Sequence, residues 1–266
     1  MKSISIFYFS GTWGTEEIVK EIRDRISPAC KVSLKSIEEH IKADKIPELN
    51  EDYTGFAFPI YAFNAPTLVY DFFKRLPDGK GHPCFILNVS GAGGEKTSNA
   101  ASTHYVKKTL HKKNYDIVYE ASFALPSNWA DAEPHAKALN KVKAALEQCQ
   151  KTAEEIRTQK RKLRPTPSVI SRLITLVGKA EHFGAGWFGE GLYADENCIS
   201  CGLCAEKCPT DTIVMKEGHP DFGKKCIFCM RCIYDCPEKA IHARRMAFSV
   251  LKNGYDIRSL FHEARR

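Results

Sequence analysis

Residues 198–209 read Cys-Ile-Ser-Cys-Gly-Leu-Cys-Ala-Glu-Lys-Cys-Pro, and residues 226–237 read Cys-Ile-Phe-Cys-Met-Arg-Cys-Ile-Tyr-Asp-Cys-Pro. Both stretches have the spacing C-x2-C-x2-C-x3-C-P. The first cysteines of the two runs are 28 residues apart, and Ile213 and Ile241, which follow the runs, have the same separation. The repeat therefore extends beyond the cysteines and indicates an internal duplication.

The spacing of the eight cysteines favours iron–sulfur chemistry. A cubane cluster needs four thiolates around a small volume, of which three can come from one tight turn with two-residue spacers. Structural zinc sites usually pair C-x2-C elements from separated knuckles and therefore fit these runs poorly, and a disulfide framework fits them less well. The other three cysteines are scattered singly and are interpreted as small apolar residues or incidental thiols, namely Cys30, Cys84 and Cys149.

Residues 193–243 resemble a bacterial two-cluster ferredoxin. In that pattern the fourth cysteine of each run ligates the cluster of the other run. The resemblance therefore implies two 4Fe-4S clusters with crossed ligand sets, one held by Cys198, Cys201, Cys204 and Cys236 and the other by Cys226, Cys229, Cys232 and Cys208.

The N-terminal stretch has the order strand, polar loop, helix. Residues 3–9 are β-branched and aromatic, residues 10–15 read Ser-Gly-Thr-Trp-Gly-Thr, and residues 16–26 have isoleucines at helical spacing. Such a loop can present backbone N–H groups and hydroxyls to a phosphate at a helix N-terminus. The same composition also occurs as a plain connection between elements.

The pattern of alternating strands and helices continues to about residue 161. Apolar runs predict further strands at 31–34, 53–60, 84–89 and 117–124. Helices are predicted at 67–76 and 132–161, and a third helix follows residues 90–94 and ends near residue 112. Five strands alternating with helices predict a doubly wound parallel sheet. Ligands of such sheets bind at the carboxyl ends of the strands, where the loops after the first, third and fourth strands are rich in glycine, serine and aromatic residues.

Residues 1–150 resemble flavodoxin, and the whole chain resembles flavodoxin–ferredoxin fusion proteins. This implies an α/β flavodoxin-like domain with a five-stranded doubly wound parallel sheet, followed by a small α+β two-cluster ferredoxin domain. The resemblance also implies flavin mononucleotide (FMN). Its binding residues would be Ser10, Gly11, Thr12, Trp13, Gly14 and Thr15 in the phosphate loop, with Pro59, Tyr61, Ala62, Phe63, Asn64, Ser90, Gly91, Ala92, Gly93 and Gly94 in the other two loops.

Trp13 departs from the usual phosphate loop, which reads Thr/Ser-x-Thr-Gly-x-Thr. Here tryptophan replaces the glycine, and Gly14 follows it. If the position needs a positive φ or a close approach of backbone to phosphate, Trp13 would obstruct binding. Two outcomes follow: the flavin is retained through the hydroxyls of Ser10, Thr12 and Thr15, or the first domain is flavin-free.

The Lys- and Arg-rich stretch around Pro165 and Pro167 predicts a domain boundary. We expect a flavodoxin-like domain at 1–155, a basic helical linker at 156–190, the ferredoxin domain at 191–243 and a basic C-terminal tail at 244–266. The net charge is +7, and its excess lies in the linker and the tail. This charge is interpreted either as a solvated helix face and ragged terminus or as a docking surface for an acidic partner.

The composition narrows the function further. The sequence has no nucleic-acid-binding motif, no nucleophile motif and no apolar stretch long enough to span a membrane. A reducing cytoplasm is expected, because thiolates remain available to iron there. We expect an electron carrier between two 4Fe-4S clusters, FMN and a redox partner protein. The alternatives are a flavin-dependent reductase of a small molecule and a flavin-free ferredoxin adaptor.

Overall fold

The first domain is built on a five-stranded parallel sheet. The computed structural model describes residues 2–91, 101–165, 167–169, 171 and 184–266. The strands follow the order β2-β1-β3-β4-β5, and every neighbouring pair is parallel. This is the flavodoxin-like winding, so the predicted fold class is confirmed. The strands are β1 (Ser3–Tyr8), β2 (Lys31–Ser36), β3 (Tyr53–Pro59), β4 (Pro83–Ser90) and β5 (Asp116–Ala124).

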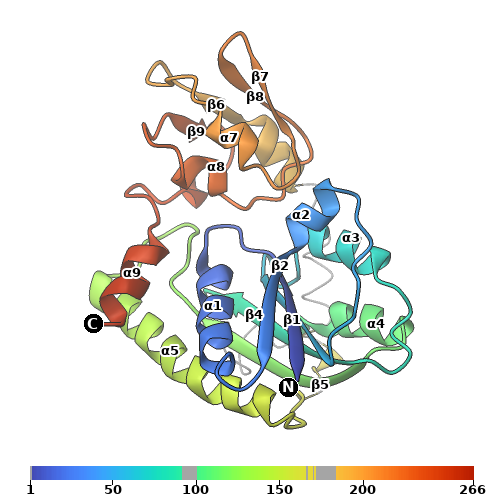
Figure 1. Cartoon of the computed structure of the whole chain (residues 1–266). Coiled ribbons are helices and arrows are strands. Elements are labelled where there is room, and N and C mark those ends of the chain that lie inside the picture. Colours follow the sequence, from blue (N-terminus) through green and yellow to red (C-terminus); the bar gives the residue numbers. More distant parts are fainter. Residues whose placement is uncertain (1, 92–100, 166, 170, 172–183) are drawn as a thin grey trace.

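Helices cover both faces of the sheet (Figure 1). One face packs against α1 (Gly14–Ile26), α5 (His135–Arg157) and α9 (Ile257–Ala264). The other packs against α2 (Ile37–Lys42), α3 (Thr67–Arg75) and α4 (His104–Lys112). Because both faces are covered, the central strands are nearly continuous apolar runs, as in YTGFAFP of β3.

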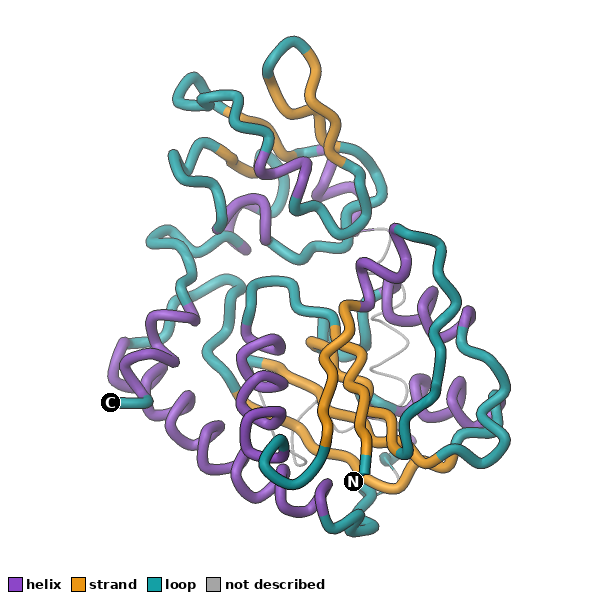
Figure 2. The backbone as a smooth tube through the Cα atoms, viewed as in Figure 1, coloured by secondary structure: helices purple, strands orange, loops and turns teal. Residues whose placement is uncertain are grey.

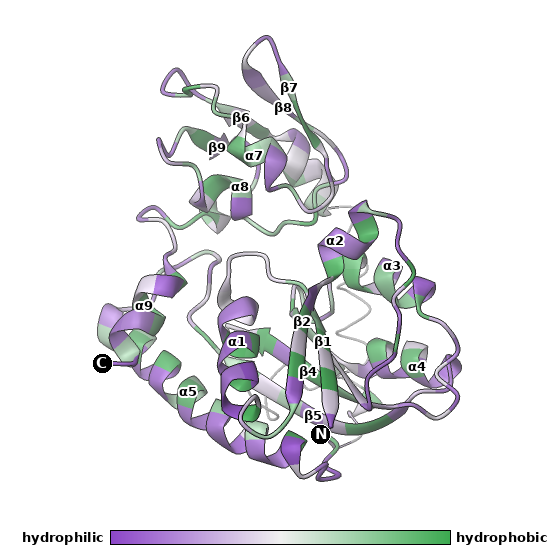
Figure 3. Ribbon diagram, in the orientation of Figure 1, coloured by the Kyte–Doolittle hydropathy of each residue, from purple (hydrophilic) through white to green (hydrophobic). Residues whose placement is uncertain are grey.

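The two faces of the sheet bury two separate cores. The core under α1 and α5 is mostly aliphatic and includes Ile6, Ile18 and Val142. The core under α3 and α4 is aromatic, with Phe56 and Phe72 fully buried. Figure 3 shows hydrophobic and hydrophilic residues alternating along α1 and α5, as expected for helices with one face on a core.

The second domain is small and carries both cysteine runs. Two antiparallel strand pairs, β6 (Leu192–Ala194) with β9 (Ile241–Ala243) and β7 (Ile213–Lys216) with β8 (His219–Phe222), flank the short helices α7 (Leu203–Glu206) and α8 (Arg231–Tyr234). Its core includes Phe188 and Phe228, whose rings meet edge to face with centroids 4.2 Å apart. Figures 1 and 2 show this domain over the edge of the sheet where β1 ends and the loop to α1 begins.

The C-terminal segment returns to the first domain. Residues 247–249 form a 3-10 turn, η2 (Ala247–Ser249), and α9 then packs on α1 and α5 with Ile257 and Phe261 buried. Arg265 forms ion pairs with Glu17 and Glu21 of α1. This part of the expected basic tail is therefore an integral helix and not a ragged terminus, and Arg265 is neutralised within the chain. Of the expected linker, residues 166, 170 and 172–183 lie outside the described part.

Helices α2 and α9 are among the described elements that had no counterpart in the sequence-based expectations. Helix α2 has only six residues, which is too short for a periodicity argument, although Ser36 caps it by accepting from the Glu39 N–H at 3.3 Å. Helix α9 lies in the segment interpreted from charge alone. Within the described residues, no helix is long and apolar enough to cross a membrane.

Replacing Phe261 with alanine tests the docking of α9. The side chain is fully buried in the core shared with α1 and α5, so its removal leaves a cavity. We expect Phe261→Ala to lower the free energy of unfolding by about 3–5 kcal/mol. Urea unfolding followed by circular dichroism measures this, and the exposed neighbour His262→Ala, expected to change stability by less than about 0.5 kcal/mol, is the control. Equal effects would show that α9 is not part of the core.

Candidate functional site

The duplication in the second domain is visible in the backbone. Three pairs of residues 28 positions apart have left-handed backbone conformations with nearly equal φ angles: Ser200 and Phe228 (57° and 59°), Gly202 and Met230 (73° and 63°), and Asp211 and Lys239 (47° and 52°). Five of these six residues are not glycine, so the conformation costs energy at each of them. The two cysteine runs therefore have one backbone geometry, which curls each run around its cysteines.

Two cavities of similar size contain the cysteines. One has about 440 Å³ of empty space, part of it open to solvent, and is lined by Cys208, Cys226, Cys229 and Cys232. The other has about 370 Å³, also partly open, and is lined by Cys198, Cys201, Cys204 and Cys236. Each cavity thus combines the first three cysteines of one run with the fourth cysteine of the other, which are the two sets that the resemblance implied.

The chemistry of these cavities fits iron–sulfur clusters. Backbone N–H groups of Phe228 and Ala240 donate to the Sγ atoms of Cys226 and Cys236, both at 3.4 Å, and such bonds stabilise cluster sulfurs. Burial raises the pKa of the Cys226 thiol to about 12. Thiolates in such a place need a positive partner, which bound iron supplies. Among the described residues no group of His, Cys, Asp or Glu converges on a point that would suit a single metal ion.

A third cavity lies at the carboxyl end of the sheet, with about 410 Å³ of empty space. It is lined by nine of the residues expected to bind a flavin: Ser10, Gly11, Thr12, Gly14, Thr15, Pro59, Tyr61, Ser90 and Gly91. Trp13, Ala62, Phe63 and Asn64 are not in its lining, and the expected Ala92, Gly93 and Gly94 lie outside the described residues. The loops after β1, β3 and β4 therefore meet at one site.

Part of this cavity comes from residues that the sequence did not indicate. Residues 125–128 follow β5 and line it, and Asn128 donates to the Thr12 hydroxyl at 2.9 Å. This loop was predictable, because it follows a strand at the same edge of the sheet. Tyr255, from the segment before α9, lines the cavity and donates to the Pro126 carbonyl at 2.9 Å. No local pattern indicates such a contact between residues far apart in the chain.

The residues after β3 form a tight turn that presents Tyr61. Tyr61 and Asn64 exchange two backbone hydrogen bonds of 2.9 Å, and both central residues have positive φ, 37° at Ala62 and 62° at Phe63. The Tyr61 hydroxyl is buried without a hydrogen-bond partner in the described structure. Burial raises its pKa well above the ordinary value, so the hydroxyl stays protonated and can donate to a ligand.

Trp13 does not lie in the cavity but at the boundary between the domains. Its φ is 70°, so this position does take the left-handed conformation, at a cost of about 1–2 kcal/mol for a residue with a Cβ. The indole Nε1 donates to Oδ1 of Asp235 at 3.0 Å. The guanidinium of Arg258 lies 4.4 Å from the indole centroid, and that of Arg231 lies 5.3 Å from it. The tryptophan thus contacts the second domain and the tail.

Gly11 lines the cavity at the carboxyl end of the sheet, called the flavin-type cavity below, and lies next to a cysteine of the second domain. A Cβ atom at this position would lie 2.0 Å from the Tyr61 hydroxyl, 3.1 Å from the Cys229 carbonyl oxygen and 3.3 Å from the Cys229 Cβ. Only glycine leaves room for this approach. One cysteine of the second run is therefore packed directly against the loop after β1.

A known protein family matches the second domain. Residues 197–241 match the family described as the 4Fe-4S dicluster domain. This confirms the resemblance to a two-cluster ferredoxin. With the strand order of the first domain, the chain is a flavodoxin-like domain followed by a 4Fe-4S dicluster domain, the organisation of a flavodoxin–ferredoxin fusion, and it is a redox protein.

Solved structures that resemble part of the chain include flavodoxins and flavin enzymes. The flavodoxin of Fusobacterium nucleatum bound to flavin mononucleotide is 17% identical, with a TM-score of 0.43 over 60% of this chain and 100% of that one. An NADH:FMN oxidoreductase in its apo form is 12% identical, with a TM-score of 0.43 over 65% and 94%. The azoreductase of Bacillus anthracis is 13% identical, with a TM-score of 0.38 over 58% and 100%.

A pair of double variants tests the crossed ligand sets. Cys208→Ala with Cys226→Ala removes two ligands from one cavity, so we expect about four irons to remain after anaerobic reconstitution. Cys204→Ala with Cys208→Ala removes one ligand from each cavity, and both clusters should be impaired. Iron analysis and cluster absorbance measure the difference. The reverse order of iron contents would show that each run ligates its own cluster.

Replacing Trp13 with glycine tests whether the indole obstructs the loop. Because the side chain contacts Asp235 and not the cavity, we expect Trp13→Gly to bind FMN no more tightly than the natural chain. Quenching of flavin fluorescence during titration measures the affinity. A tightening of about tenfold, which corresponds to about 1.4 kcal/mol, would show that the indole occupies the phosphate position.

Proposed function

We propose that this chain is an electron-transfer protein that passes electrons between two 4Fe-4S clusters and an FMN held at the carboxyl end of the sheet. The packing of Cys229 against Gly11 is the observation that carries the proposal, since it puts a residue that lines one cysteine cavity in contact with a residue that lines the flavin-type cavity. When bound, the clusters supply one-electron chemistry and the flavin supplies one- or two-electron chemistry.

The cysteines would hold the clusters in the crossed sets that line the two cavities. Cys198, Cys201, Cys204 and Cys236 would ligate the first cluster, and Cys208, Cys226, Cys229 and Cys232 the second. Cys208 and Cys229 of the second set are buried, and this burial together with N–H bonds to sulfur would tune the potential. A reducing cytoplasm would keep these eight cysteines available to iron.

The cavity beside the sheet would hold the FMN. Ser10, Thr12 and Thr15, which carry hydroxyls, line it at the N-terminal end of α1, where anions are favoured. The unpartnered Tyr61 hydroxyl is a further donor. A group that gives this hydroxyl an acceptor would remove the cost of leaving it buried and unsatisfied.

The exposure of the cysteines suggests the order of the centres. Cys201 is exposed and the neighbouring Ile199 is 60% exposed, whereas Cys208 and Cys229 are buried. A redox partner could therefore approach the first cluster, while the second cluster faces the flavin. Electrons would pass from partner to first cluster, second cluster and flavin, or in the reverse order. The exposed Ile199 offers an apolar contact at the docking surface.

Rapid mixing of the cluster-loaded, FMN-loaded chain with a one-electron viologen reductant tests this order. We expect about eight irons and one FMN per chain, and fast bleaching of the flavin. In Cys208→Ala with Cys226→Ala, which lacks the second cluster, flavin bleaching should slow by about tenfold or more, because the inner connection is lost. Cys30→Ala, at a buried cysteine outside the three cavities, is the control.

Two results would contradict the proposal. Absence of bound flavin after reconstitution would favour a flavin-free adaptor. Flavin reduction at the same rate without the second cluster, accompanied by steady turnover of quinones or nitroaromatics, would favour a flavin-dependent reductase in which the clusters are not on the path.

A further inference from the structure

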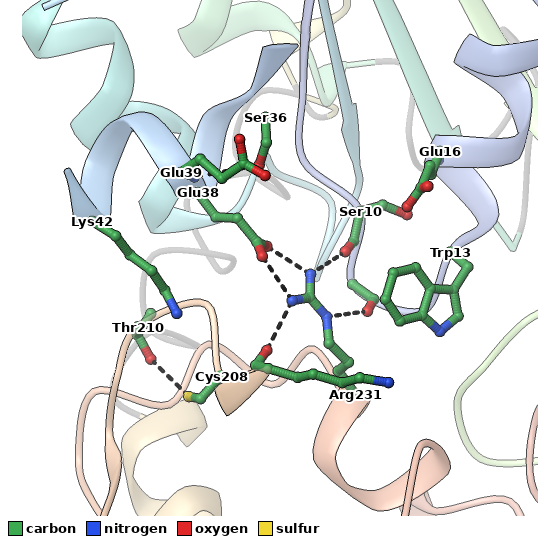
Figure 4. Close-up of polar contacts among 12 residues, drawn as sticks. Ser10, Trp13, Glu16, Ser36, Glu38, Glu39, Lys42, Cys208, Thr210 and Arg231 are labelled. Carbon is green, nitrogen blue, oxygen red and sulfur yellow. Dashed lines mark hydrogen bonds and ion pairs between the residues drawn. The ribbon is translucent and has the colours of Figure 1, made fainter. Parts of the chain in front are cut away.

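Arg231 uses every donor of its guanidinium at the boundary between the domains. It lies inside the second cysteine run, and only 4% of the residue is exposed. In the first domain, Nε donates to the Gly11 carbonyl at 2.9 Å and Nη2 donates to the Ser10 carbonyl at 2.6 Å. The remaining donors reach the Lys207 carbonyl at 2.8 Å and both carboxylate oxygens of Glu38 at 2.9 and 2.7 Å. Figure 4 shows these bonds converging on the guanidinium from two domains.

The two carbonyl bonds fix the orientation of the next two peptide groups. In a planar trans peptide the C=O and the following N–H point in opposite directions, and the chain has no cis peptide bond. Because the Ser10 and Gly11 carbonyls face Arg231, the N–H groups of Gly11 and Thr12 point away from it. Neither N–H has a hydrogen-bond acceptor among the described residues. Both residues line the flavin-type cavity, whereas Arg231 does not.

We propose that Arg231 is a positioning residue for the phosphate of the flavin. By holding the Ser10 and Gly11 carbonyls behind the loop, it keeps the N–H groups of Gly11 and Thr12 directed at the phosphate. The inference rests on the proposed function, because it takes FMN as the ligand of this cavity. Its consequence is that the second domain completes the phosphate site of the first domain.

The arrangement calls for arginine in particular. A guanidinium offers five donors in a rigid plane, and here all five have acceptors on three segments of the chain. A lysine ammonium has three donors on a flexible stem and could not hold both carbonyls and the carboxylate in one plane. Glu38 balances the buried charge, so the residue acts on the loop through its hydrogen bonds and not as a free cation beside the phosphate.

Comparison of FMN with riboflavin, which lacks the phosphate, tests the role of Arg231. The full chain is loaded with clusters, stripped of flavin, and titrated with each compound while flavin fluorescence is followed. We expect Arg231→Met to weaken FMN binding by about 10- to 100-fold, because the loop N–H groups would lose their fixed orientation toward the charged phosphate. Riboflavin binding should change little. Arg231→Lys, which keeps the charge, should show a smaller loss confined to FMN.

A second contact across the same boundary supplies the matched control. Lys42 of α2 pairs with Asp211 of the second domain at 2.6 Å, away from the phosphate loop. Lys42→Met should weaken the binding of neither FMN nor riboflavin. The iron content of each variant shows whether its second domain has folded. If Arg231→Met loses iron, the FMN and riboflavin affinities of Arg231→Lys test the role of Arg231 instead.

The possible results separate this inference from the proposed function. An unchanged FMN affinity, or equal weakening of FMN and riboflavin, would overturn the role of Arg231 while leaving the flavin site in place. If the natural chain binds neither compound, the proposed function fails and takes this inference with it. Selective loss of FMN in the arginine variants, and not in Lys42→Met, supports the proposal.

Discussion

The arrangement of the two domains depends on the hydrogen bonds that the buried guanidinium of Arg231 makes. It binds two carbonyls of the loop after β1, a carboxylate of α2 and a carbonyl of the first cysteine run. An unpaired charge in this place would be costly, so the contact is stable only when all its acceptors are present. Because Arg231 stands between Cys229 and Cys232, the same bonds bring a cluster cavity against the flavin-type loop.

In the proposed assignment, the crossed cysteine sets give the second domain a comparable dependence on its clusters. Each cavity is closed by a cysteine from the other run, and the small core holds only a few apolar side chains such as Phe188 and Met230. A domain of this size is only marginally stable on packing alone, so cluster ligation as proposed would supply much of its stability. Loss of the second cluster would therefore loosen the segment that holds Arg231, which lines the same cavity.

The local patterns of the sequence predicted the sheet and the two cysteine runs, because both depend on short spacings, and the resemblance to a two-cluster ferredoxin implied the crossed sets. The contacts at the boundary were not predictable in this way. Trp13 appeared to obstruct the phosphate loop, yet it bonds Asp235, 222 residues later in the chain. Arg231 lay inside the motif as an unremarked spacer, and Tyr255 reaches the cavity from the tail. These side chains are placed by packing between distant segments, which leaves no periodicity to read.

The most direct test of the account is an anaerobic crystal structure of the chain loaded with iron and FMN, with anomalous data collected at the iron edge. We expect iron in both cysteine cavities, the second cluster beside Gly11, and the phosphate on the N–H groups of Gly11 and Thr12 with Arg231 behind the loop. A phosphate bound directly by Arg231, or a second cluster turned away from the loop after β1, would contradict it.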